Sequence, residues 1–98
     1  MSKFGELIDF DVPVLFNFYT DWNDSSTLMH SILRDVAAAV GDKGKVIKID
    51  IDKNRQLAEA LRIKTLPTHI IYKDGEMRWR QSGELDANTL ISLMQQNA

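Results

Sequence analysis

The apolar residues of the chain follow two patterns, one typical of buried strands and one of helices with a single buried side. Residues 14–19, VLFNFY, are apolar on both faces except at Asn17, as expected for a central strand covered by helices on both sides. Residues 25–40 have apolar side chains at helical spacing, which predicts an amphipathic helix. The members of this apolar stripe are Met29, Ile32, Leu33, Val36, Ala37 and Val40. Gly41 and Gly44 follow, as expected after a helix.

The rest of the pattern predicts two more helices after this one, a short helix at the start of the chain and three more strands. Residues 2–9 form the first helix with Ser2 as its cap, residues 45–52 a strand, and residues 54–63 a short helix. Its expected cap is Asn54 and its inward residues are Leu57, Ala58 and Leu61. Residues 68–73 and 76–83 flank an Asp-Gly turn, a strong hairpin signal. Residues 85–96 complete the pattern as an amphipathic helix capped by Asp86.

This order of elements predicts a single α/β domain over residues 1–98. The first two strands are joined through a helix and should therefore be parallel, whereas the last two form an antiparallel hairpin. We expect a mixed sheet of about four strands with helices on both faces.

Composition narrows the possible functions. The chain has 98 residues and a formal net charge of −2, with no basic block of the kind that nucleic-acid-binding proteins carry. Its apolar runs are far shorter than a membrane span, and its first residues lack the apolar core of a signal peptide. We therefore expect no nucleic-acid or membrane partner and a cytoplasmic location, unless a leader has been cut from the sequence. There is no cysteine, so thiolate chemistry and cysteine-ligated metals are excluded for this sequence, and we expect no metal and no cofactor.

Several motifs, in order along the chain, resemble the thioredoxin family. PVLFNFYTDW (13–22) resembles the strand before the redox motif of that family, and WNDSST (22–27) stands where the family has Trp-Cys-Gly-Pro-Cys-Lys. KIDIDKN (48–54) resembles the next strand and its turn. IKTLPT (63–68) resembles the segment that contains a cis-proline, and YKDGE (72–76) resembles the hairpin. The resemblance runs from about Phe4 to Met94 and implies a thioredoxin fold.

The chain departs from this family at the residues that carry its chemistry. Asn23 and Ser26 occupy the positions of the two redox cysteines, and Asn17 replaces a buried carboxylate. Lys48 matches a lysine that is buried in the family. Disulfide exchange requires a thiolate nucleophile, which an amide or an alcohol cannot replace. We therefore expect no catalytic residues and interpret the domain as a redox-inactive binding or adaptor module.

The polar residues near the altered motif allow more than one interpretation. We expect Asn17, Ser26, His30 and Lys48 to form a buried, hydrogen-bonded cluster with a structural role. Alternatively, Ser26 and His30, which are four residues apart on one helix face, could serve as nucleophile and base in a non-redox enzyme. In a third interpretation the domain is a folded remnant, or a relative whose oxidoreductase assignment rests on homology alone.

The resemblance also implies a binding surface. It consists of residues that flank the redox site in the family: Trp22, Leu66, Pro67, Thr68 and Gly83. In the family, the residue before the cis-proline pairs its backbone with an extended stretch of a client, and this requires no thiol. The expected partner is an unidentified protein or extended peptide, bound by a monomer or weak dimer. An alternative is that Pro67 serves only the fold.

Two aromatic side chains of the hairpin complete the list of candidates. His69 shares a strand face with Ile71 and Lys73, which predicts a packed or half-exposed histidine rather than a ligand. Trp79 stands between two arginines, and we expect it to pack against the core.

Overall fold

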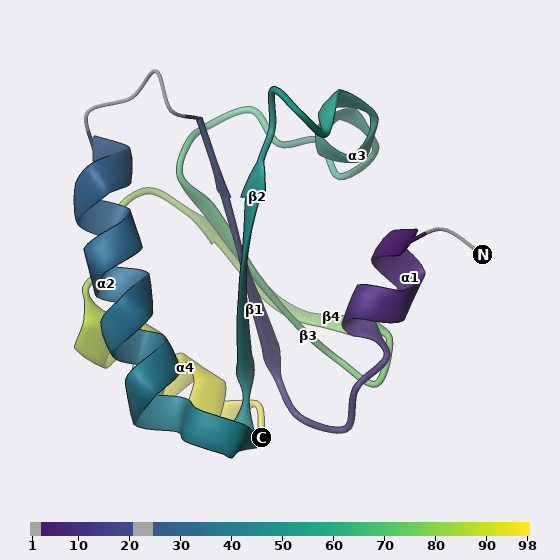
Figure 1. Cartoon of the computed structure of the whole chain (residues 1–98). Coiled ribbons are helices and arrows are strands. Elements are labelled where there is room, and N and C mark those ends of the chain that lie inside the picture. Colours follow the sequence, from purple (N-terminus) through teal and green to yellow (C-terminus); the bar gives the residue numbers. More distant parts are fainter. Residues whose placement is uncertain (1–2, 21–24) are drawn as a thin grey trace.

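The computed structural model describes residues 3–20 and 25–98, and for Lys3, Ser25 and Ser26 it describes the backbone alone (Figure 1). Four helices and four strands follow one another in the predicted order, with one short 3-10 turn at Gly41–Lys43. The elements are α1 (Lys3–Ile8), β1 (Val14–Tyr19), α2 (Ser25–Val40), β2 (Lys45–Asp50), α3 (Arg55–Ala60), β3 (Thr68–Lys73), β4 (Glu76–Ser82) and α4 (Ala87–Gln96).

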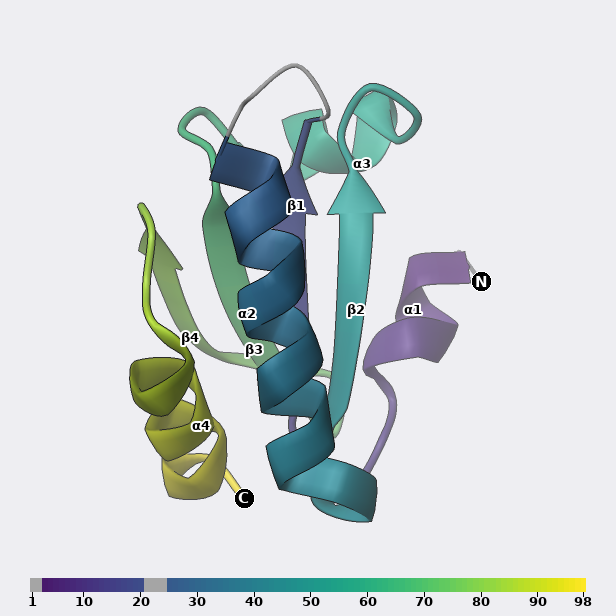
Figure 2. The same cartoon turned by 60° about the vertical axis from the view of Figure 1, so that its left-hand side comes forward.

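The four strands form one mixed sheet in the order β2-β1-β3-β4. β1 runs parallel to β2 and antiparallel to β3, and β3 pairs with β4 in the expected antiparallel hairpin. Helices α2 and α4 cover one face of the sheet, while α1 and α3 lie against the other (Figures 1 and 2). The predicted α/β architecture is confirmed.

The two helical layers explain why β1 is apolar on both faces. Its residues Val14, Phe16 and Phe18 belong to a core cluster on the side of α1 and α3, while Leu15 belongs to the cluster beneath α2 and α4. All four side chains are fully buried. Removing this much apolar surface from water is the main source of stability for a sheet enclosed in this way.

Helix ends and helix faces agree with the sequence pattern only in part. The carboxylate of Asp86 accepts a hydrogen bond from the amide of Thr89 at 2.8 Å, so its predicted capping role is confirmed. Asn54 stands at the cap position of α3, but its amide donates to the carbonyl of Asp50 instead, so the prediction of a side-chain cap was wrong. Ala37 is exposed, and the buried stripe of α2 is narrower than the pattern predicted.

The loop between α3 and β3 reaches the sheet through a cis peptide bond between Leu66 and Pro67. The amide of Gly83, directly after β4, donates to the carbonyl of Pro67 at 2.8 Å. The segments before β3 and after β4 are therefore held together at one end of the sheet.

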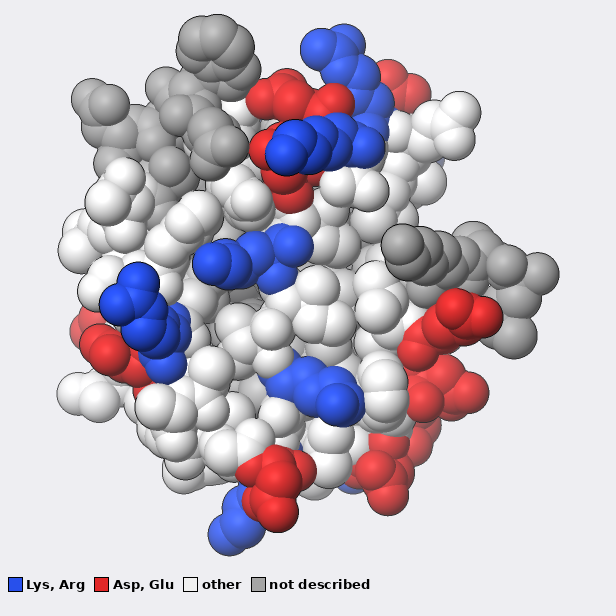
Figure 3. Space-filling view, in the orientation of Figure 1, with Lys and Arg blue, Asp and Glu red and all other residues white. Residues whose placement is uncertain are grey.

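The charged side chains on the face shown in Figure 3 form separate groups among neutral residues. Acidic side chains gather on the right-hand side of this view, where α1 lies in the same orientation (Figures 1 and 3). In the part of the chain that the structure describes, no helix combines the length and apolar character needed to cross a membrane.

Candidate functional site

The candidate site lies at the end of the sheet where β1 finishes and β3 begins. Phe18 of β1 is opposite Thr68 of β3, and Thr68 is opposite Ser82 of β4, so three strands meet there. The first turn of α2 lies at the same end (Figures 1 and 2). On that turn Leu28 is 57% exposed and, among the residues whose side chains are described, it is one of two large apolar side chains on the surface.

Leu66 leaves its backbone polar groups unused at this end of the sheet. Its side chain is half-buried and packs against the core cluster below α3. Its amide and carbonyl have no hydrogen-bond partner among residues 3–20 and 25–98. An unpaired amide and carbonyl next to an ordered strand are the groups that an extended peptide can pair with.

The neighbours of Leu66 are held firmly in place. Pro67 and Thr68 are buried, and the hydroxyl of Thr68 donates to the carbonyl of Thr65 and lies 3.0 Å from the hydroxyl of Ser82. Thr68, which we expected at the binding surface, is therefore an internal residue that anchors the loop. Gly83 is half-buried with a φ of 100°, a conformation that favours glycine.

Three of the expected site residues cannot be placed. Trp22 and Asn23 lie outside the described residues, and of Ser26 only the backbone is described. The roles given to these three residues stay predictions.

Asn17 is fully buried and pairs with a residue that the sequence analysis did not include in its cluster. Its side-chain nitrogen lies 3.2 Å from Nδ1 of His69, which is also fully buried. The two residues face each other across the antiparallel pairing of β1 and β3. Strand spacing indicated the face on which His69 lies, but only the register of the two strands reveals this contact.

The hydrogen bonds of His69 determine its tautomer. Nε2 lies 3.1 Å from the carbonyl of Gly83, and a carbonyl can only accept, so Nε2 carries the proton. In the neutral ring Nδ1 then accepts from Asn17. Burial lowers the pKa of His69 below 6.5, partly offset by the bond to Gly83, so the neutral ring is favoured. The side-chain oxygen of Asn17 is buried and has no hydrogen-bond partner within residues 3–20 and 25–98.

Lys48 lies outside the predicted buried cluster. Lys48 is exposed because β2 is an edge strand, so the expectation of a buried lysine was wrong. The ring of His30 packs edge-on against Tyr19, with 4.7 Å between the ring centres. Its Nε2 is buried and has no hydrogen-bond partner among the side chains that the structure describes, which do not include that of Ser26. The buried polar pair that the structure contains is Asn17 with His69.

The described residues offer little for metal or acid–base chemistry. No three side chains of His, Cys, Asp or Glu gather as metal ligands within residues 3–20 and 25–98. Trp79, as expected, packs partly buried against the cluster beneath α4. What this end of the sheet does offer is an unpaired stretch of backbone between fixed neighbours.

Comparison with known proteins gives a consistent result. The profile of the thioredoxin family matches residues 1–96. The chain is 42% identical over 91 residues to thioredoxin Y of the chloroplast from Oryza sativa subsp. japonica, an alignment that covers 92% of this chain and 54% of that protein. It is 28% identical to thioredoxin from Rickettsia bellii, covering 94% of this chain and 88% of that protein.

Solved structures agree with these sequence matches. A chloroplastic thioredoxin z superposes with a TM-score of 0.83 at 27% identity, covering 98% of this chain and 89% of that chain. A malaria parasite thioredoxin-2 gives the same TM-score and identity, covering 87% and 82% of the two chains. The chain spans about half the length of the first chloroplast relatives that it matches.

Proposed function

We infer that this chain, which belongs to the thioredoxin family, is a peptide-binding domain that does not catalyse thiol–disulfide exchange. The proposed ligand is an extended segment of another protein. It would pair its backbone with Leu66 and lie between the first turn of α2 and Gly83.

The observation that carries this proposal is that the amide and carbonyl of Leu66 have no hydrogen-bond partner within the described part of the chain. Strand addition derives its affinity from main-chain hydrogen bonds, and its specificity comes from neighbouring side chains. The exposed apolar side chain of Leu28, at the same end of the sheet, is a candidate for such a contact. Because Pro67, Thr68 and Gly83 are fixed by internal hydrogen bonds and burial, little conformational entropy would be lost there on binding.

The absence of thiol chemistry follows from composition. The sequence contains no cysteine, and exchange proceeds by attack of a thiolate on a disulfide sulfur. A solved relative, the chloroplastic thioredoxin z, is described as defining a type-specific target recognition, which supports recognition as a role that this fold can serve.

The contacts described for His30 do not favour the alternative of a hydrolase that uses Ser26 and His30, and the side chain of Ser26 lies outside the described part of the structure. Nε2 of His30 is buried, and the ring packs against Tyr19. A general base needs a nitrogen within reach of the nucleophile and the substrate.

A peptide-selection experiment tests the proposal. A displayed library of random short peptides is selected against the chain, and a selected peptide is titrated into isotope-labelled protein. We expect the largest amide shifts at Leu66, at Gly83 and in the first turn of α2. Shifts confined to the pocket lined by Phe4 of α1 and by Leu57 and Ala60 of α3, or no selected peptide, would contradict the proposal.

Matched substitutions sharpen this test. Leu66→Asp places a charge beside the proposed pairing edge and should weaken binding about tenfold, equivalent to about 1.4 kcal/mol. Met77→Asp is the control, because Met77 is 46% exposed on β4 near the opposite end of the hairpin. Thermal unfolding of both variants distinguishes a loss of binding from a loss of structure. Equal affinities of the two folded variants would exclude Leu66 as the contact.

A further inference from the structure

Arg80 connects β4 to the end of α3. Its two terminal nitrogens donate to neighbouring carbonyls, Nη1 to Leu61 at 2.5 Å and Nη2 to Arg62 at 2.9 Å. Arg80 stands opposite Ile70, on the sheet face that α1 and α3 cover. Burial raises the pKa of Tyr72, and the positive charge of Arg80 partly offsets this effect, in keeping with its place on that face. The guanidinium of Arg80 thus connects β4 to the loop after α3 through two hydrogen bonds.

The turn that ends α3, which Arg80 contacts, contains a residue other than glycine in a left-handed conformation. The amide of Arg62 donates to the carbonyl of Glu59, and the amide of Ile63 donates to that of Ala58. This pair of bonds marks a helix that ends through a left-handed residue, where glycine is common. Here that residue is Arg62, with a φ of 56°. Its side chain makes this conformation unfavourable, so the turn needs support from outside the helix.

Arg80 supplies that support. The carbonyls at a helix end carry partial negative charge, and a cation placed beside them is favourable. A guanidinium that donates to two carbonyls also fixes their relative orientation, since its donors form a planar fork. Arg80 therefore stabilises the left-handed turn through Leu61 and Arg62.

The loop from this turn to Pro67 is short and fixed at both ends. Ile63, Lys64, Thr65 and Leu66 connect Arg62 to Pro67. The far end is held by the Thr68 hydroxyl on the carbonyl of Thr65 and by the Gly83 amide on the carbonyl of Pro67. With so few residues between the two anchors, the direction in which the chain leaves Arg62 sets the path of Leu66.

We propose that Arg80 is a positioning residue for peptide binding, which holds the loop in the conformation that presents the backbone of Leu66. This inference rests on the proposed function. Arg80 does not contact the peptide, and its effect on affinity is exerted through Leu61 and Arg62. A weaker anchor lets the loop sample other paths, and the peptide then binds only the fraction of molecules with the correct one.

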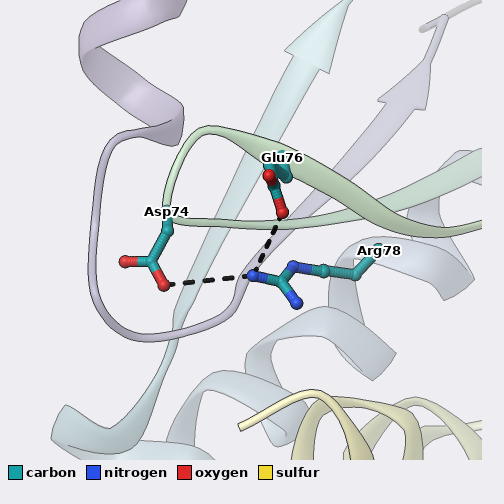
Figure 4. Close-up of polar contacts among 3 residues, drawn as sticks. All are labelled: Asp74, Glu76 and Arg78. Carbon is teal, nitrogen blue, oxygen red and sulfur yellow. Dashed lines mark ion pairs between the residues drawn. The ribbon is translucent and has the colours of Figure 1, made fainter.

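The neighbouring Arg78 offers a matched control. It lies on the same strand and makes ion pairs only within the hairpin, at 4.0 Å with Asp74 and 3.4 Å with Glu76 (Figure 4). Arg78→Gln and Arg80→Gln remove the same charge from the same strand, but only Arg80→Gln frees the loop.

Two measurements test the inference. We expect Arg80→Gln to speed amide hydrogen exchange about tenfold at Arg62 and Ile63, whose amides are hydrogen-bonded in the turn, while exchange in the core strands stays unchanged. Affinity for a library-selected peptide should fall about fivefold, and Arg78→Gln should match the wild type in both measurements. Adding Arg62→Gly to Arg80→Gln should recover part of both losses, because glycine adopts the left-handed turn without support.

The possible outcomes separate this inference from the proposed function. Equal loop exchange in Arg80→Gln and Arg78→Gln would overturn the positioning role, whether or not a peptide binds. Faster loop exchange with unchanged peptide affinity would overturn it as well. If the wild type binds no peptide, the proposed function fails, and with it the role of Arg80 in binding, although the exchange data would still establish Arg80 as the anchor of the loop.

Discussion

Asn17→Asp should reverse the dependence of stability on pH that His69 gives the wild-type chain. The substitution is nearly isosteric, so it changes charge and hydrogen bonding at a fully buried position with little change in packing. The new carboxylate at position 17 would accept a hydrogen bond from a protonated Nδ1 of His69, while Nε2 continues to donate to the carbonyl of Gly83. Both ring nitrogens would then be satisfied in the charged imidazolium rather than in the neutral ring.

The direction of the wild-type dependence follows from the lowered pKa. The unfolded chain takes up a proton on His69 near pH 6.5, whereas the folded chain takes it up only at lower pH. The contribution of the neutral ring is therefore fully present above about pH 6.5 and is lost as the pH falls from there toward the folded pKa. The free energy of unfolding of the wild type should rise with pH across this window.

In Asn17→Asp we expect the free energy of unfolding to fall as the pH rises. At the 3.2 Å that now separates the two side chains, a carboxylate and an imidazolium attract by about 5 kcal/mol at an effective dielectric constant of about 20. Even one third of this, about 1.7 kcal/mol, changes the proton affinity of the ring more than tenfold. The pKa of His69 then rises, and its contribution to stability is present at low pH and is lost as the pH increases through the folded pKa.

Two assays measure this reversal. The ring signals of the two histidines are followed by NMR as a function of pH, and urea unfolding is repeated between about pH 5 and pH 8. Gln81→Glu is the control, since Gln81 is the exposed neighbour of His69 on β4 and its new charge is screened by water. The assigned contact would be incorrect if His69 had the same pKa in Asn17→Asp and in the wild type. It would also be incorrect if the free energy of unfolding of both proteins changed with pH in the same direction.

Three further predictions concern the chemistry, the turn after α3 and the cap of α4. The wild-type chain should not accelerate reduction of insulin by dithiothreitol, measured by turbidity, because it contains no thiol; acceleration by the pure chain would contradict the proposed function. Arg62→Gly should stabilise the fold by up to about 1.6 kcal/mol in urea unfolding, since it removes about 1–2 kcal/mol of left-handed strain, while the greater entropy of the unfolded chain costs about 0.4–1 kcal/mol; a clear loss of stability would show that the turn is not strained. Asp86→Ala should lower the melting temperature at neutral pH. Hydrogen bonds from Thr89 lower the pKa of Asp86 below 3.8, so the wild-type advantage should disappear as the pH falls through that lowered value, and an advantage that persists there would contradict the assigned cap.

The sequence pattern predicted the elements well because each depends on neighbouring residues. The doubly apolar strand at 14–19 and the cap at Asp86 are local features, and both are confirmed. Asn54 shows the limit of such reasoning. It is a good capping residue at the right position, yet its side-chain amide donates to the carbonyl of Asp50 instead of capping α3. A local pattern shows that a polar group is available, but not which of two nearby partners it selects.

The candidate site was harder to predict because it depends on strand order and register. Lys48 was expected to be buried, but its strand lies at the edge of the sheet, which periodicity alone does not reveal. The pairing of Asn17 with His69 joins residues 52 positions apart and depends on the register of β1 against β3. The same holds for Arg80, whose partners lie 18 and 19 positions away, in a loop on another layer of the fold.

Once these contacts are known, the buried pair and the surface loop belong to one arrangement. Asn17 donates to His69, His69 donates to the carbonyl of Gly83, and the amide of Gly83 donates to the carbonyl of Pro67. This series of hydrogen bonds links the centre of the sheet to the residue that follows Leu66. Arg80 holds the other side of the same loop. Both anchors restrict the loop before any ligand arrives, and a restricted loop loses less entropy on binding. Weakening the contact between Asn17 and His69, or removing the Arg80 guanidinium, should therefore reduce peptide affinity even though none of these three side chains touches the peptide.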